Sequence, residues 1–262
     1  MVDRLEGFIL EKELNFHHDG FRGTIIEIGL WKEQRVAVKF GIKELQEYEA
    51  KMMKEIGYHP NIIQLIELRE EFIVVEAFGD GKTLHDIEEK IPLKTITDWM
   101  LQVALPLKHL HDKDIIHHDI KDKNILIHEG KIKLCDFELT IKGKNGIFGA
   151  GTTKWMAPEI QYDEDVEITN KIDIYAFGLL FSRLIHTGRE IDVVKYSCPI
   201  KILNLIYDCI DRNPENRPNI DQVIKILSLS DYGNSILEDL LEKADGENKN
   251  KVLELISNLK FD

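Results

Sequence analysis

The sequence has few cysteines and no long hydrophobic run. Its three cysteines, Cys135, Cys198 and Cys209, are odd in number and lack the paired spacing of a metal site, which favours free thiols in a reducing compartment. The longest hydrophobic block, residues 174–181, is far shorter than the roughly 20 residues that a membrane helix needs. The first ten residues are charged and do not resemble a secretory signal. We therefore expect a cytoplasmic protein that does not enter a membrane.

Basic side chains are scarce relative to acidic ones. The chain has 34 Lys and Arg against 47 Asp and Glu, a formal net charge of -13. Binding to a phosphate backbone depends on clustered basic side chains, so we expect no nucleic-acid partner. With 262 residues, 43% hydrophobic and 31% charged, the composition is that of a globular protein, long enough for one large domain or two unequal lobes.

The hydrophobic pattern changes about one third of the way along the chain. Before that point it predicts strands at 24–31, 35–40, 62–68 and 72–77, and a helix at 43–56 that Gly57 ends. Gly79 and Gly81 then mark a break. The predicted helices that follow are 95–111, 173–186, 200–211 and 220–229, and a small hairpin joins 125–127 to 132–134. This pattern predicts a smaller lobe at about 1–78 and a larger one at about 79–230.

Lys39 ends a predicted strand and follows three hydrophobic residues. A buried ammonium without an anionic partner is costly, so Lys39 calls for a carboxylate, although strands often end in an exposed lysine. Glu49 is a candidate partner. It lies one helical turn from Leu45 and Met53, which turns it towards the hydrophobic side of its helix. The alternative is that Glu49 is a solvated acid among neighbouring glutamates.

Gly20 and Gly23 stand in a turn before the first predicted strand. Because glycine has no Cβ, its backbone can approach a phosphate group closely. A glycine-containing turn is more often only a hairpin, so the pair alone does not establish a phosphate site.

A polar loop around residues 117–124 is followed, after the small hairpin, by Asp136. Asp119 and Asn124 lie five residues apart in that loop. Such a set can supply one general base and two oxygen ligands for Mg²⁺, which prefers carboxylate and amide oxygens. Any one of these residues is common in loops, and it is the ordered set that points to this chemistry.

From about residue 8 to residue 229, the order of these elements resembles the eukaryotic protein kinases. A glycine turn, a strand lysine, a catalytic loop and a metal-binding acid follow one another as in that family. Residues 151–159 resemble the end of its activation segment. Glu159 and Arg217 resemble its buried ion pair, which a small-molecule phosphotransferase is not expected to carry. The resemblance implies an α+β, bilobal protein-kinase fold, with a small antiparallel β-sheet lobe containing one helix and a larger, mainly helical lobe.

The same resemblance implies an enzyme that transfers the γ-phosphoryl group of ATP, with Mg²⁺ or Mn²⁺, to Ser or Thr hydroxyls of protein substrates. It makes Asp119 the base, places Lys121 at the transferred group, and places Lys39, held by Glu49, at the nucleotide phosphates. It assigns Asn124 and Asp136 to the metal. The residues that it places around the nucleotide are Gly20, Gly23, Ile25, Ala37, Lys39, Val75, Glu76, Phe78 and Leu126. The residues that it places in a hydrophobic column between the lobes are Met53, Leu65, His117 and Phe137.

Four positions depart from what the family pattern implies. His18 replaces the first glycine of the turn, His118 replaces the arginine before the base, and Glu138 replaces the glycine after Phe137. Pro106 lies inside a predicted helix, where it removes a backbone hydrogen bond. None of these changes removes the base or a metal ligand, so we expect an active kinase. The alternative is a weak or silent pseudokinase that binds nucleotide or a partner.

The activation segment is poor in hydroxyl groups. Between Asp136 and Pro158 the only hydroxyl residues are Thr140, Thr152 and Thr153, and the resemblance implies that Thr152 bonds inward near Asp119 and Lys121. Without the usual arginine, we expect activity that does not need phosphorylation of this segment. The alternative is that protonated His118 or a nearby lysine reads a phosphate on Thr140 or Thr153.

Residues 231–262 lie beyond the resemblance. They form an acidic extension with hydrophobic residues at helical spacing. We expect two short helices that dock on the larger lobe or on a partner.

Overall fold

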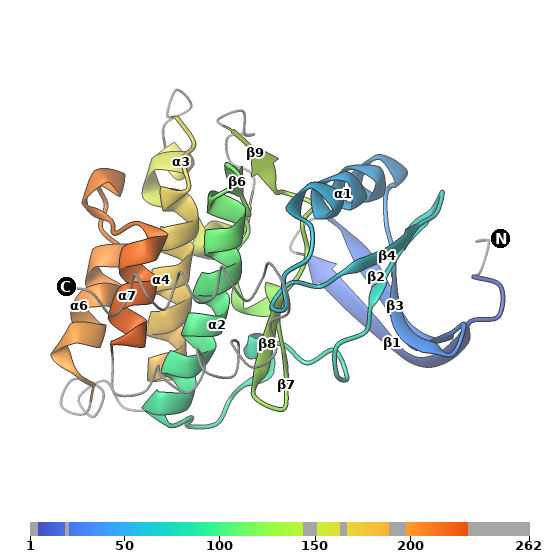
Figure 1. Ribbon diagram of the computed structural model, residues 1–262, viewed down its shortest axis with the longest axis horizontal. Helices are drawn as coiled ribbons and strands as arrows, with labels where there is room; N and C mark the ends of the chain where they lie inside the picture. The colour runs from blue at the N-terminus through green and yellow to red at the C-terminus, as the bar shows by residue number, and fades with distance from the viewer. Residues whose placement is uncertain (1–4, 19–20, 144–150, 163–166, 189–197, 230–262) are drawn as a thin grey trace, which may run out of the picture.

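The computed structural model describes residues 5–18, 21–143, 151–162, 167–188 and 198–229. The chain folds into a lobe built on a sheet and a lobe built on helices (Figure 1). The smaller lobe is a five-stranded antiparallel sheet of order β1-β2-β3-β5-β4. Its strands are β1 (Ile9–His18), β2 (Phe21–Trp31), β3 (Gln34–Phe40), β4 (Leu65–Leu68) and β5 (Phe72–Glu76).

A two-residue turn joins β2 to β3 and sets their register. Lys32 and Glu33 have φ of 50° and 64°, as in a type I′ turn, whose twist matches that of adjacent strands. Ile28 consequently pairs with Ala37 and Ile26 with Lys39. The four side chains share one face of the sheet because directly paired residues point to the same side.

Helix α1 (Lys43–Ile56) has the predicted bounds and contacts β4 and β5. Gly57 ends it with φ of 70°, a conformation that glycine adopts without a steric cost. The buried face of the helix carries Glu49 beside Ala50, Met52, Met53 and Ile56. The periodicity therefore predicted correctly that Glu49 turns to the hydrophobic side.

The larger lobe is arranged around helix α2 (Leu93–His111), which contacts two of its other helices (Figure 1). Pro106 is buried within α2 and does not end it. The other helices are α3 (Pro158–Tyr162), α4 (Lys171–His186), α6 (Ile200–Cys209) and α7 (Ile220–Ser228). The predicted helices of this lobe are confirmed to within two residues at each end.

Two short antiparallel pairs hold the loops that face the smaller lobe. The predicted hairpin is formed by β7 (Ile125–His128) and β8 (Lys131–Leu134), through a turn at Glu129 and Gly130. Strand β6 (Ile115–Ile116) pairs with β9 (Ile141–Lys142). These two pairs bracket the polar loop 117–124 and the segment 135–140.

One buried hydrophobic cluster extends through both lobes. It contains Met53 of α1, Ile73 of β5 and Phe177 of α4, each less than 8% exposed. The lobes therefore share packed hydrophobic side chains as well as the polar contacts of the cleft. Among the described residues, no helix has the length and apolar character to cross a bilayer.

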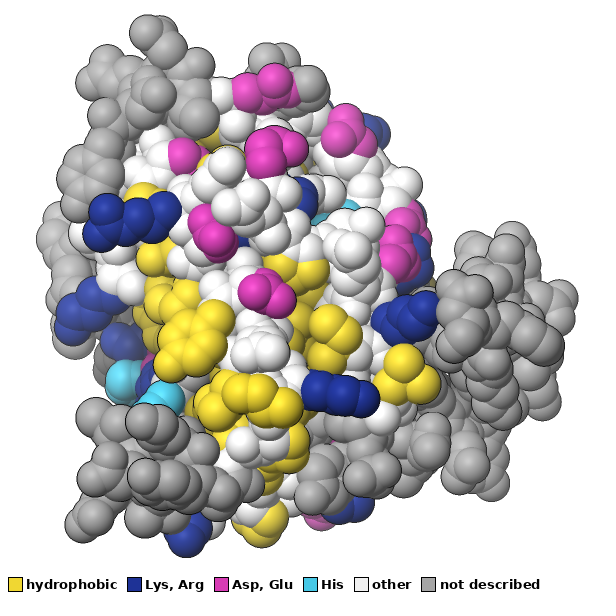
Figure 2. Space-filling model, turned by 90° about the vertical axis from the view of Figure 1, so that its left-hand side faces the viewer, with side chains coloured by type: hydrophobic (Ala, Val, Ile, Leu, Met, Phe, Trp, Pro, Cys, Tyr) yellow, Lys and Arg dark blue, Asp and Glu magenta, His cyan; other side chains and the backbone are white. Residues whose placement is uncertain are grey.

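Hydrophobic side chains gather on the end of the larger lobe seen in Figure 2. Two large exposed hydrophobic residues, Ile200 and Tyr207, lie on α6. The predicted helices of the extension, residues 231–262, lie outside the described residues.

Candidate active site

A cavity of about 320 Å³ lies between the sheet and the larger lobe. One part of its wall is hydrophobic and includes Leu14, Ile26, Ile28, Ala37, Val75 and Leu126, while the polar part includes Lys39, Glu49, Asn124 and Asp136. Glu76 and Phe78, from the segment that joins the lobes, also line it. A largely hydrophobic cavity with a few convergent polar groups is typical of a small-molecule site.

Ile25 is not part of this cavity, contrary to the expectation from the sequence. It is 41% exposed and pairs with Phe40, whereas Ile26 pairs with Lys39 and lines the cavity. Consecutive side chains of a strand point to opposite faces, so the resemblance placed the hydrophobic contact one residue too early. Gly20 lies outside the described residues, and Gly23 is in β2.

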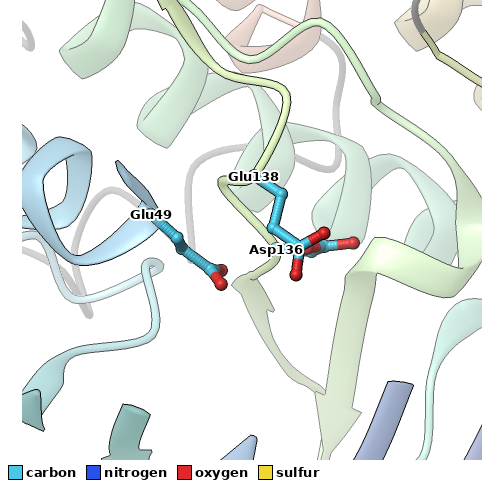
Figure 3. A group of neighbouring side chains, drawn as sticks. All are labelled: Glu49, Asp136 and Glu138. Carbon is cyan, nitrogen blue, oxygen red and sulfur yellow. The ribbon is translucent and has the colours of Figure 1, made fainter. Parts of the chain in front are cut away.

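The ammonium of Lys39 is surrounded by three carboxylates. Its Nζ atom lies 2.8 Å from Glu49 Oε2, 2.7 Å from Asp136 Oδ1 and 2.9 Å from Glu138 Oε1. Figure 3 shows the three acids converging from α1 and from the segment after β8. The expected pair of Lys39 and Glu49 is therefore present, and Glu138 is a contact that the sequence did not indicate.

These charges shift the pKa values of the cluster in different directions. Burial alone would lower the pKa of Lys39, but Asp136, Glu49 and Glu138 together hold it well above the usual value. Burial would raise the pKa of Asp136, yet Lys39 brings it down to about 2. Burial raises the pKa of Glu49, against the opposing effect of Lys39. Asp136 is consequently an ionised oxygen donor at neutral pH.

Asp119 is the centre of a second cluster, in which Asp119, Lys121 and Asn124 are buried and Thr152 is half-buried. Lys121 Nζ lies 2.5 Å from Asp119 Oδ2, and the hydroxyl of Thr152 donates to Asp119 Oδ1 at 2.9 Å. Asn124 Nδ2 donates to Asp119 Oδ2 at 3.0 Å and to Asp119 O at 2.9 Å. The inward hydrogen bonds expected of Thr152 are therefore present, and the carboxylate is held in one orientation.

The start of the catalytic loop is fastened to α4 by Asp173. Its carboxylate accepts hydrogen bonds from the backbone N–H groups of His117 and His118, each at 2.9 Å, and contacts His111 Nε2 at 2.9 Å. Burial would raise the pKa of Asp173, but the bond from His111 and the neighbouring charges lower it. Asp173 was not among the site residues predicted from the sequence, although an acid between Ile172 and Ile174 in a hydrophobic helix indicates a buried carboxylate with hydrogen-bond donors around it.

His118 occupies the position where the family pattern implies arginine. It is 7% exposed, has φ of 70°, and burial lowers its pKa. An imidazole that is buried and neutral is poorly suited to pair with a phosphate group.

The predicted hydrophobic column is assembled next to Lys39. Phe137 is fully buried and its ring centroid lies 5.1 Å from that of His117. Met53 belongs to the same buried cluster, and the partly buried Leu65 packs against it. The N–H of Phe137 donates to Glu49 Oε1 at 2.9 Å, so the column and the ion pair of Lys39 support each other.

A separate ion pair, also expected from the sequence, lies in the larger lobe. Arg217 Nη1 and Nη2 donate to the two carboxylate oxygens of Glu159 at 2.6 and 2.7 Å. The Arg217 side chain is fully buried. Its Nε also donates to Asp211 O at 2.8 Å, so this pair is a structural anchor for the end of the activation segment.

The chain belongs to the protein kinase family, because residues 20–227 match the family described as the protein kinase domain. A protein kinase domain uses ATP and a divalent metal ion. The donors present fit such ligands: Asp136 is an ionised carboxylate, and Asn124 engages its amide nitrogen with Asp119, which leaves the side-chain oxygen for a cation.

The relatives of this chain described below are named as protein kinases. It is 29% identical to the mitogen-activated protein kinase kinase kinase 7-like protein of Drosophila melanogaster, over 85% of this chain and 67% of the relative. It is 29% identical to mitogen-activated protein kinase kinase kinase 12 of Rattus norvegicus, over 83% of this chain and 27% of the relative. It is 30% identical to the probable serine/threonine-protein kinase drkB of Dictyostelium discoideum, over 77% of this chain and 34% of the relative. The matches thus span about a third or less of the last two proteins.

Proposed function

We propose that this chain is an active kinase that phosphorylates serine or threonine hydroxyls of protein substrates. The observation that carries the proposal is the cluster at Asp119, whose carboxylate is bonded by both Lys121 and Thr152. A lysine two residues after the base resembles the serine/threonine kinases, and the name of the Dictyostelium relative agrees with that specificity.

Each buried polar group has a role in this proposal. Asp119 orients the acceptor hydroxyl and accepts its proton. Lys121 stabilises the negative charge that develops on the transferred group, and Lys39, held by Glu49, binds the nucleotide phosphates. Because phosphoryl transfer depends mainly on positioning and electrostatic stabilisation, the support comes from how closely these groups are held together.

Asn124 and Asp136 hold the divalent ion in this proposal. Both offer oxygen atoms, which suit Mg²⁺ and also Mn²⁺; we propose Mg²⁺ as the working ion. The ion supplies positive charge that offsets the charge of the phosphates. Loss of the Asp136 carboxylate should therefore weaken nucleotide binding in the presence of Mg²⁺ more than in its absence.

The test is transfer of radiolabelled phosphate from ATP to a general protein substrate, followed by phosphoamino-acid analysis. We expect label on serine or threonine with the wild-type chain and far less with Asp119→Asn. Label on tyrosine alone would overturn the hydroxyl preference, and equal label with both proteins would overturn the role of Asp119.

The second candidate is a pseudokinase that binds nucleotide or a partner. The observation that favours it is the contact of Lys39 with three carboxylates, whose negative charge opposes the binding of phosphate. Nucleotide binding without any transfer above the level of Asp119→Asn would select this alternative.

A further inference from the structure

Three carboxylates crowd the ammonium of Lys39. Its Nζ atom donates to Glu49 Oε2 at 2.8 Å and to Asp136 Oδ1 at 2.7 Å, and Glu138 Oε1 lies 2.9 Å from it in a third ion pair. Figure 3 shows the three acidic side chains close to one another. A phosphate oxygen that approaches Lys39 therefore meets like charge at close range unless one of the three carboxylates moves away.

Two of the three carboxylates are needed where they are. Glu49 is 2% exposed and also accepts a hydrogen bond from the N–H of Phe137. Moving Glu49 would therefore leave that buried N–H, next to the hydrophobic column, without its acceptor. Asp136 is the ionised oxygen donor assigned to the metal. Glu138 has a side chain that is 23% exposed, and it follows Phe137 in the chain. It can turn towards solvent without disturbing buried groups.

We propose that Glu138 is a tethered competitor for nucleotide phosphate, which occupies Lys39 in the nucleotide-free protein and leaves it when phosphate binds. This inference rests on the proposed function, in which ATP phosphates meet Lys39. Three carboxylates around one ammonium also leave an excess of negative charge where the phosphates arrive. Like charges repel strongly in a partly buried site, where water and salt screen them weakly. The glycine that the family pattern implies at this position has no side chain that could compete.

The competition acts on phosphates and not on the nucleoside. The hydrophobic part of the cavity, formed by Ala37, Val75 and Leu126 among others, carries no charge that Glu138 could attract or repel. Removing the charge of Glu138 should therefore tighten ADP binding and leave adenosine binding unchanged. The effect should be larger without Mg²⁺, because the cation offsets part of the same repulsion.

The experiment is calorimetric titration of ADP and of adenosine, each with Mg²⁺ and with a chelator, into the wild-type chain and Glu138→Gln. The matched control is Glu129→Gln, which removes the same charge from an exposed side chain on the β7–β8 turn. We expect ADP to bind Glu138→Gln about two- to fivefold more tightly than wild type, the scale of one partly exposed charge contact. Adenosine binding and the control variant should match wild type.

Each other outcome has a definite meaning. Equal ADP affinity in wild type and Glu138→Gln would overturn the competition while leaving the proposed kinase intact. Weaker ADP binding by Glu138→Gln in Mg²⁺ would overturn it as well, since Glu138 would then assist the cation. Equal tightening of ADP and adenosine would show an effect that is not specific to phosphate, and would also overturn it. Failure of every protein to bind either ligand would overturn both the inference and the proposed function.

Discussion

Two buried ion pairs join distant parts of this chain, and they differ in how their charges are balanced. Arg217 meets one carboxylate, that of Glu159, through two parallel hydrogen bonds of 2.6 and 2.7 Å. Its other bonds go to backbone oxygens of Asp211 and Lys171. Lys39 instead meets the carboxylates of Glu49, Asp136 and Glu138.

The difference is the one expected between a structural contact, at Arg217, and the proposed phosphate site, at Lys39. One cation and one acid in bidentate geometry form a closed unit that holds two segments together. A cation among three acids leaves an excess of negative charge, and such an arrangement is costly for the fold unless a further cation offsets that charge. We therefore expect changes in the cleft to alter binding and catalysis, and changes at Arg217 to alter stability.

The largest expected effect comes from Asp119→Asn in the cleft. Loss of a general base lowers turnover by roughly 10²- to 10⁴-fold. Some loss of thermal stability is also expected, because the buried ammonium of Lys121 loses its carboxylate partner. The measurement is the steady-state transfer rate together with thermal unfolding. Asp112→Asn, which changes a side chain 57% exposed at the end of α2, is the control. If Asp119→Asn lost as much stability as Arg217→Met, the proposed difference between the cleft and the Arg217 ion pair would be wrong.

Arg217→Met should have its main effect on folding. It leaves the Glu159 carboxylate without its buried cation, which typically costs about 3–5 kcal/mol. The free energy of unfolding, measured by denaturant titration, should fall by that amount. Arg69→Met is the matched control, because the Arg69 side chain is 48% exposed beside Glu67 and such surface pairs contribute about 1 kcal/mol or less. If both variants lost equal stability, the Arg217 pair would not be a special anchor.

The pH dependence of stability should be set partly by the catalytic-loop histidines. Burial lowers the pKa of His117 and His118 from 6.5, so below that pH the unfolded chain takes up protons that the folded chain does not. Stability should therefore fall as the pH decreases from about 6.5, by at most about 1.4 kcal/mol per pH unit for each histidine. His118→Asn should flatten this slope, since asparagine does not titrate and tolerates the positive φ. His128→Asn, at a site 46% exposed, should not. An unchanged slope in His118→Asn would contradict the assignment.

The smallest expected effect is that of phosphatase treatment, which should leave the transfer rate unchanged. Thr140 is fully buried and the hydroxyl of Thr152 is bonded to Asp119, which leaves Thr153 as the exposed hydroxyl among the three threonines of the segment. His118 is buried and its pKa is lowered, so it is a poor partner for a phosphate. The transfer rate before and after treatment should agree, and a large loss of rate would refute this prediction.

The sequence predicted the features that depend on local spacing. Helical periodicity gave the bounds of α1 and the inward direction of Glu49, and motif order grouped Asp119, Asn124 and Asp136. It did not predict β1, because this strand lies at the edge of the sheet and carries exposed charged residues at 11–13 that break the alternation of a half-buried strand.

Two further positions were not predicted correctly, because strand register and contacts between distant segments cannot be read from local spacing. The resemblance placed Ile25 at the nucleotide, but the family motif does not fix strand register, and a shift of one residue turns the side chain to the other face. Glu138 was noticed only as a departure from glycine. Its contact with Lys39 joins residues 99 positions apart in sequence, and it depends on where β3 and the segment after β8 meet in space.

The attachment of the catalytic loop to Asp173 determines how the site responds to rigid-body rotation of the lobes. Asp119, Asn124 and the N–H groups of His117 and His118 are all tied to the helical lobe through short bonds, whereas Lys39 belongs to the sheet. Hinge opening would therefore lengthen the 2.7 Å contact between Lys39 and Asp136 and leave the distance from Asp119 to Asn124 unchanged. In the proposed function, such opening would change how nucleotide phosphates reach Lys39 and would leave Asp119 and Asn124 in place for the acceptor hydroxyl.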